Sequence, residues 1–456
     1  MRGVASNRLN MVLARCALGA AIGLAFAVPA HALSLQEAYE AALRNDPAYR
    51  MRIKEAEGGK EYAIQGRAGL LPNVSASWTA SRNIADQTTM RTNALGVQVP
   101  EFSNPRYISR SGVVQLRQPI LNLEAFVRYK QGKVQTAQSE QALEAGTDEV
   151  AVRVTRAYMD VLFAQDQVAL SKVQRDVYAE QRQVNDRLFK NGEGTRTDSL
   201  ETQARYDLSE AQLIEAEDNL VSLRETLQGV VGMDPGNLDQ LGDNFRPLEL
   251  SMKSYEEWEK VALERNNTLA TARLSVENSR LEINRYRAGH APRVDFIATY
   301  NKGDNESLNQ YGINSTNRQL GLQVNIPIYS GGSVNSTTRQ AAANYGRAQA
   351  DLDLRTNEIL VELRKSYSIV QSSSRKVDAL IKAVDSAKLL MTATEQSIKG
   401  GVRINLDLLN AQQTLFVAQR DLAQARYGYL LGVIRLRAAA GTLDSQVIRE
   451  IGAYFR

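Results

Sequence analysis

GEGTRTDSLETQARYDLSEAQLIEAEDNLVSLRETLQGVVG at 192–232 returns, in altered form, as GVRINLDLLNAQQTLFVAQRDLAQARYGYLLGVIRLRAAAG at 401–441. The correspondence extends upstream without a gap, so that residues 149–232 lie on residues 358–441 at an offset of 209. Earlier still, QLRQPIL (115–121) matches QVNIPIY (323–329), and RAGLLPNV (67–74) matches RAGHAPRV (287–294). A unit of roughly 200 residues is too long for a solenoid repeat. The pattern predicts a duplicated, pseudo-symmetric subunit.

Both halves have the same order of elements. A helix is expected at about 35–66 and again at 255–286, and each ends at the motif RAG-x-x-P because proline cannot continue a helix. Two strands joined by a polar loop follow, and then a long helical pair broken only by a glycine turn. The predicted division is a first half at 33–232, a linker at 233–254, a second half at 255–441 and a C-terminal tail at 442–456.

Four strands are predicted, at about 72–83, 109–118, 293–301 and 318–329. Apolar residues occupy every second position, as at Val74, Ala76, Trp78 and Ala80, which is typical of a strand with two different faces. The fourth strand continues the pattern through Leu320, Leu322, Val324, Ile326 and Ile328. The strands alone fit two structures: a transmembrane barrel, or an ordinary antiparallel sheet with one face on a soluble core.

The helices favour the barrel. Residues 122–190 contain no proline, so a continuous helix of about 100 Å is possible at a rise of ~1.5 Å per residue. After the turn, apolar residues alternate in spacings of three and four, the seam of a coiled coil: Leu213, Ala216, Leu220, Leu223, Leu227 and Val230. Long helices with a narrow apolar seam and otherwise polar surfaces suit the wall of a wide hollow cylinder.

Residues 1–32 are typical of a secretory signal peptide. Three arginines precede or open an apolar run at 16–28, and Ala30-His31-Ala32 supplies a cleavage site. The apolar run is ~13 residues, shorter than the ~20 that a helical span requires, although a retained anchor is the alternative. No later stretch is apolar enough for a membrane helix, so a place in a membrane would require a β-barrel. The protein is expected to be periplasmic, secreted or in the outer membrane.

The composition excludes several classes of function. The chain has 55 Lys+Arg against 51 Asp+Glu, and three of the arginines lie in the signal peptide. A nearly balanced charge argues against nucleic acid as a partner. Cys16 also lies in the signal peptide, so no thiolate site remains, and His290 is the one histidine left. We therefore expect no enzyme, no cofactor and no structural metal.

Four strands cannot close a membrane barrel, since small barrels need about eight. An open edge in lipid leaves backbone groups unpaired at several kcal/mol each. The chain is therefore expected to share strands with copies of itself. Two copies would give eight strands and a filled interior, and three would give twelve; the long helices favour three.

The sequence resembles the TolC family of outer-membrane factors. The resemblance rests on LSLQEAYEAALRNDPAY (33–49), LLPNV (70–74), the Q-P-I at 118–120 before the long helix, and the segment 401–443. It implies a mainly α fold: a homotrimeric twelve-stranded β-barrel in the Gram-negative outer membrane, continuous with a coiled-coil α-barrel across the periplasm. It also implies a passive exit duct for drugs or secreted proteins, docked on a periplasmic adaptor and an inner-membrane ABC or RND-type transporter. The alternative is a soluble periplasmic coiled-coil scaffold or adaptor.

By the same resemblance, the two helix–turn–helix tips at 190–198 and 399–407 close the entrance and meet the adaptor. The glycines there allow the chain to reverse. Thr197 and Asp198 of the first tip would pair with Arg403 of the second as a gate latch; alternatively, Asp198 only caps its helix. The predicted adaptor-docking residues are Asn191, Gly192, Gly194, Gly400, Gly401 and Val402.

Asp407 matches the position at which the family carries an acidic ring around the pore. Three such carboxylates would attract cations and select against anions. Many relatives carry a second acid one turn later, where this chain has Asn410. The resemblance therefore implies a single, weaker ring; the alternative is that Asp407 is an ordinary helix residue.

Overall fold

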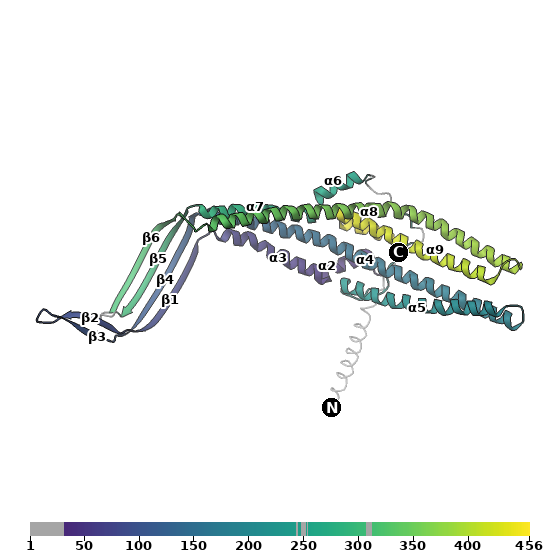
Figure 1. Cartoon of the computed structure of the whole chain (residues 1–456), viewed down its shortest axis with the longest axis horizontal. Coiled ribbons are helices and arrows are strands. Elements are labelled where there is room, and N and C mark those ends of the chain that lie inside the picture. The colour runs from purple at the N-terminus through teal and green to yellow at the C-terminus, as the bar shows by residue number, and fades with distance from the viewer. Residues whose placement is uncertain (1–31, 243–244, 248–251, 253, 307–311) are drawn as a thin grey trace, which may run out of the picture.

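The computed structural model describes residues 32–242, 245–247, 252, 254–306 and 312–456. The predicted signal peptide falls almost entirely outside them. The chain is long and narrow: strands project from one end of a helical body, and the α4–α5 and α8–α9 turns lie at the other end (Figure 1).

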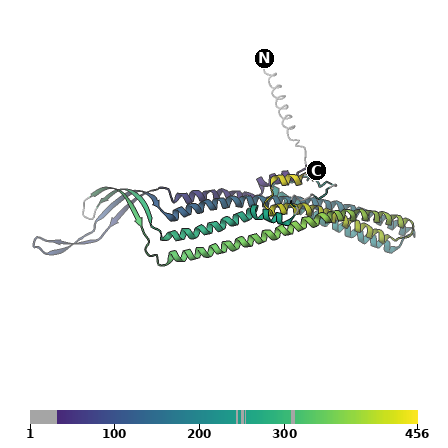
Figure 2. The same ribbon diagram turned by 90° about the horizontal axis from the view of Figure 1, so that it is seen from above.

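Helices make up most of the chain. The longest are α4 (Leu123–Lys190) and α8 (Ser333–Lys399), which are followed by α5 (Arg196–Val231) and α9 (Asn405–Ala439). The others are α2 (Leu35–Asn45), α3 (Pro47–Ala68), α6 (Tyr255–Arg265), α7 (Asn267–Arg287), the short 3-10 helix η1 (Ala288–His290) and α10 (Ser445–Gly452). Figure 2 shows α3, α4, α7 and α8 side by side in one layer, the order in which neighbouring helices touch.

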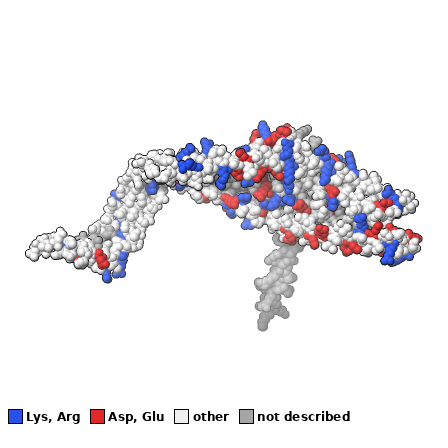
Figure 3. Space-filling model, in the orientation of Figure 1, with Lys and Arg blue, Asp and Glu red and all other residues white. Residues whose placement is uncertain are grey.

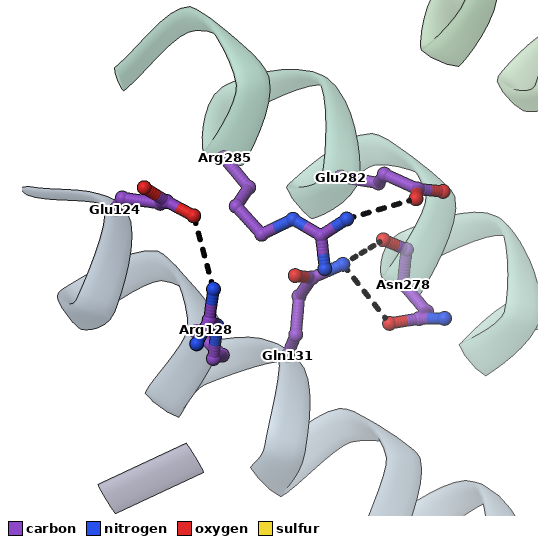
Figure 4. Close-up of polar contacts among 6 residues, drawn as sticks. All are labelled: Glu124, Arg128, Gln131, Asn278, Glu282 and Arg285. Carbon is purple, nitrogen blue, oxygen red and sulfur yellow. Dashed lines mark hydrogen bonds and ion pairs between the residues drawn. The ribbon is translucent and has the colours of Figure 1, made fainter. Parts of the chain in front are cut away.

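Polar contacts join α4 to α7 within this layer. Figure 4 shows Gln131 of α4 reaching towards Asn278 of α7, with its amide nitrogen 3.4 Å from the backbone oxygen and 3.5 Å from the side-chain oxygen. Arg285 and Glu282 of α7 form an ion pair at 3.2 Å beside it. The helices are thus held by polar side chains as well as by apolar seams. Among the residues that the structure describes, none of the helices combines the length and the apolar character needed to cross a membrane.

The main sheet has four antiparallel strands in the order β1-β4-β5-β6. Their bounds are Asn73–Ile84, Arg106–Leu121, Arg293–Glu306 and Gly312–Asn325. The predicted strand at 318–329 is wrong at both ends: it starts earlier and stops at Asn325, two residues before Pro327, which has no N–H for the ladder. The loop predicted between the two strands of the first half is partly ordered, because it contains an antiparallel hairpin of β2 (Gln87–Thr92) and β3 (Gln98–Ser103).

The expected single helices at 35–66 and 255–286 are each two helices. The first breaks at Asp46, whose carboxylate caps α3. Pro47 follows it and occupies the first position of α3. The second breaks at Asn266, whose side chain caps α7. The C-terminal ends of α5 and α9 are hydrogen-bonded at these two breaks. The side-chain amide of Asn45 donates to the carbonyl of Val231 at 3.0 Å, and the side-chain amide of Asn266 donates to the carbonyl of Ala439 at 3.0 Å.

The apolar core lies midway along the body, where α2, α6 and α10 pack on the long helices (Figure 1). The segment after 441 is not a free tail. It contains α10, and Phe455 packs edge-on against Tyr158 at 5.7 Å between ring centroids. The segment after α5 also joins the core, since Leu238 pairs with Leu33 and Leu241 pairs with Phe455 in isolated bridges. The middle of the molecule is therefore the best-packed region, and both ends extend from it.

Candidate functional site

One face of the main sheet is apolar and bare. The register aligns Val74, Leu116, Ala298 and Leu320 in one row across all four strands. Trp78 on the same face is 71% exposed and Leu320 is 76% exposed. In the part of the chain that the structure describes, no helix lies over this face (Figures 1 and 2), which disfavours a sheet packed on the chain's own soluble core. Large apolar side chains left in the open indicate a surface that contacts an apolar environment or partner.

The opposite face of the sheet is polar. One row joins Ser75, Gln115, Thr299 and Gln319 across the four strands. Deeper along this face, towards the helices, Arg117 of β4 forms an ion pair with Asp295 of β5. A sheet with an apolar face and a polar face, whose outer strands β1 and β6 have open edges, has the pattern of a piece of a water-filled transmembrane barrel.

A cavity of about 880 Å³ lies where α9 ends and α7 begins, between α4 and α8. Arg153, Arg156 and Arg435 face Asp148 and Glu362 around it. Asp148 is the perturbed group: burial raises its pKa to about 6, although the amide of Asn267 donates to its carboxylate at 3.0 Å and opposes the shift.

Asp148→Asn is expected to stabilise the folded protein at pH 8 and to have little effect near pH 4. The pKa of Asp148 is higher in the folded protein than in the unfolded chain. Its contribution to the stability of the folded protein is therefore complete below the unfolded pKa and is lost as the pH rises through about 6. The gain at pH 8 should be up to about 2 kcal/mol after solvent screening. Thermal unfolding followed by circular dichroism at both pH values checks this, with Asp353→Asn on the exposed surface as the control. An equal gain at both pH values would contradict the role of burial.

The first tip is ordered by its own capping contacts. Gly192 adopts a left-handed conformation (φ 78°) at the turn. The hydroxyl of Thr195 accepts from the backbone N–H of Asp198 at 3.1 Å and donates to the carboxylate of Asp198 at 2.5 Å. The cap of α5 is therefore Thr195, and Asp198 completes it from within the first turn. Thr197 is exposed beside it.

In the second tip, Gly401 is left-handed (φ 72°), and Arg403 lies 3.8 Å from Asp407 in the first turn of α9. The structure therefore does not bring Arg403 to Asp198 within one chain: each has a partner in its own tip. Asn410 is contacted from α5, because Arg205 donates to its side-chain oxygen at 3.4 Å.

A polar cluster of three side-chain amides and one hydroxyl connects the two tips within the chain. No local sequence pattern predicts it. It consists of Gln181, Asn185, Thr202 and Asn405. The hydroxyl of Thr202 accepts from Asn185 at 2.7 Å and from Asn405 at 3.3 Å, and Gln181 donates to Asn405 at 2.8 Å. Asn185 and Thr202 are buried where a coiled coil usually has apolar residues. The cluster couples α9 to the α4–α5 pair through uncharged hydrogen bonds.

Comparisons with known proteins agree with this geometry. The sequence model of the "Outer membrane efflux protein" family matches residues 38–233 and again 258–442. The chain is 39% identical to "Alkaline protease secretion protein AprF" of Pseudomonas aeruginosa, over 93% of this chain and 88% of that protein. It is 36% identical to "Proteases secretion protein PrtF" of Dickeya chrysanthemi, over 94% and 92%.

Solved structures show the same fold. The Campylobacter jejuni CmeC outer membrane channel superposes with a TM-score of 0.77 at 16% identity, covering 92% of this chain and 90% of that one. The expected resemblance is thus confirmed. The chain belongs to the outer membrane efflux protein family, the TolC family of outer-membrane factors.

Proposed function

We propose that three copies of this chain form an outer-membrane channel through which secreted proteins leave the cell. The observation that carries the proposal is the main sheet, with its bare apolar face, its polar face and its two open edges. Strand β1 of one copy would pair with β6 of the next, giving twelve strands with the polar face inwards. The helical layers of the three copies would then form the tube that reaches across the periplasm.

Membrane placement can be tested with the two tryptophans of the chain. Trp78 lies on the apolar face of β1, whereas Trp258 is fully buried in the core. In a reconstituted trimer, brominated acyl chains are expected to quench most of the Trp78 fluorescence and little of the Trp258 fluorescence, because bromine quenches only at short range. Trp258→Phe and Trp78→Phe variants separate the two signals. Equal quenching of both would contradict the placement of this face in lipid.

Secreted proteins are proposed as the cargo because two relatives that are more than 35% identical to this chain are both named for protease secretion. The tips, with Asn191, Gly194 and Val402 among their exposed or turn residues, are proposed to dock on a periplasmic adaptor and an inner-membrane transporter that supplies the energy. The channel itself would conduct passively and would catalyse no reaction.

Complementation tests the cargo. In Pseudomonas aeruginosa cells that lack AprF, this chain is expected to restore protease activity in the culture medium. A variant that lacks residues 399–407 serves as a matched control for docking, provided that it reaches the outer membrane in equal amount. Restoration of drug resistance without any protease in the medium would contradict protein export and favour efflux.

The entrance is proposed to close by contacts between copies. Arg403 of one copy would bind Asp198 or Thr197 of its neighbour, since within one chain the tips do not make this contact. Asp407 would form the single acidic ring, and Arg403 would weaken its negative potential wherever it stays 3.8 Å away, as it does within the single chain. Asn410 adds no charge to the ring.

A further inference from the structure

The apolar face of the sheet becomes basic towards the end that carries the β2–β3 hairpin. The residues concerned all point to the same side as Trp78, because they occupy matching registers: Arg110 pairs with Ala80, and Lys302 pairs with Gly112 opposite Trp78. We call this set the basic belt. It consists of Arg82, Arg106, Arg110 and Lys302, all of them exposed.

The cations of the basic belt are poorly neutralised. Asp304 lies in the same registers, 3.9 Å from Arg110, at the limit of an ion pair. Within the described residues, no ion pair satisfies Arg82, Arg106 or Lys302. Figure 3 shows blue patches and a smaller red patch near the hairpin, on a strand region that is otherwise mostly white.

The height of the basic belt is set by the strands. The apolar row through Val74 and Leu320 precedes the row of Ala80 and Arg110 by six residues, or roughly 20 Å along a strand at ~3.3 Å per residue. If the apolar band lies in the hydrocarbon, the belt lies at one membrane surface. It is the surface farther from the helices, because the helices leave the sheet at the opposite end (Figure 1).

We propose that the basic belt binds the phosphate groups of glycolipids in the outer leaflet of the outer membrane, while the apolar row below it contacts their acyl chains. This inference rests on the proposed trimeric channel, in which three belts form one ring around the barrel. Arginine and lysine near an anionic lipid surface each contribute about 1 kcal/mol. Exposed cations above an exposed apolar band match a lipid with an anionic head better than an acidic protein, which would leave the apolar band uncovered.

Binding can be measured on the intact trimer in nanodiscs of zwitterionic phosphatidylcholine. The probe is diphosphorylated lipid A, and the comparison lipid is the same molecule without its phosphates. Native mass spectrometry counts the lipid A retained per trimer. The triple variant Arg82→Gln, Arg110→Gln and Lys302→Gln removes three cations from each protomer. Its affinity for lipid A should be about 100-fold weaker, because each cation contributes a factor of roughly five and the three factors multiply. The matched control, with the same change in charge on exposed helix positions, is Lys60→Gln, Lys376→Gln and Lys382→Gln.

Equal binding of the two lipids, or equal binding by the triple variant and the wild type, would overturn the proposal. Preference for phosphatidylglycerol over lipid A would also overturn it, because that lipid does not define the outer leaflet. If the triple variant does not assemble, the test uses Lys302→Gln alone and the wild type at high salt. Both should bind less lipid A than the wild type at low salt, and unchanged binding in both would contradict the proposal. Single-channel conductance of the same preparations keeps the two proposals apart: channels that conduct without binding lipid A refute only the belt, whereas a wild type that does not conduct refutes the channel.

Discussion

Arg403→Ala is expected to hold the periplasmic entrance of the proposed trimer open and to raise its single-channel conductance several-fold. Each charge-assisted hydrogen bond to Asp198 of a neighbouring copy contributes roughly 1.5–3 kcal/mol. Three of them sum to about 5 kcal/mol or more, which is close to the ~5.5 kcal/mol that takes a two-state equilibrium from 99:1 to 1:99. Asp198→Ala should have the same effect, because it removes the other partner.

Planar-bilayer recordings test the latch against two alternatives. Arg196→Ala removes an exposed cation from the first tip and should leave conductance at the wild-type level. The charge swap Asp198→Arg with Arg403→Asp should close the entrance again, which a purely capping role of Asp198 does not predict. Unchanged conductance in both alanine variants would remove the latch.

Ion selectivity in the same recordings reports on Asp407. Asp407→Asn should weaken cation selectivity, because it removes the proposed ring. Arg403→Ala should strengthen it, because the carboxylate loses a cation 3.8 Å away. If neither variant shifts the reversal potential, Asp407 does not face the pore.

The features that a short local pattern encodes could be predicted from the sequence. Alternation along each strand placed Val74, Trp78 and Leu320 on one face, and the register confirms that these strands share it. The glycine turns were found because Gly192 and Gly401 interrupt otherwise uniform helical patterns. The break at Asp46 has a readable signal, since Asp-Pro is a helix start, but the helix predicted at about 35–66 does not take it into account.

The remaining features depend on distant segments. Gln181, Thr202 and Asn405 belong to three helices, and nothing in their local sequence shows that their side chains meet. The β2–β3 hairpin was missed because its residues are mostly polar and include Pro100, which resembles loop composition. Whether Arg403 binds Asp407 or Asp198 is likewise a matter of assembly, and no single-chain pattern encodes it.

Gly441→Ala is expected to cause the largest loss of stability of any single methyl addition proposed here. Gly441 follows α9 with φ 67°, and a Cβ there would lie 2.5 Å from the backbone oxygen of Arg265 and 2.8 Å from the Cα of Asn266. Left-handed backbone costs an alanine about 1–2 kcal/mol. Overpacking against atoms that cannot rotate away adds roughly 1–3 kcal/mol. The variant should therefore lose about 2–5 kcal/mol per protomer.

The loss of stability on substitution should depend on the atoms that the new Cβ meets at each glycine, and not only on the backbone angle there. Gly331 has φ 60° with open space around its Cβ position, so Gly331→Ala isolates the conformational term. Gly232, the repeat counterpart of Gly441, would meet the Cβ of Asn45 at 2.5 Å. Rotation of the side chain cannot move this atom, so the last residue of α2 has to shift, at the expense of the hydrogen bond from Asn45 to Val231. Trimer-to-monomer transition temperatures should fall least for Gly331→Ala, more for Gly232→Ala and most for Gly441→Ala. Equal losses at all three would show that the close approach of α9 to the start of α7 does not limit stability, because only the backbone angle is common to the three positions.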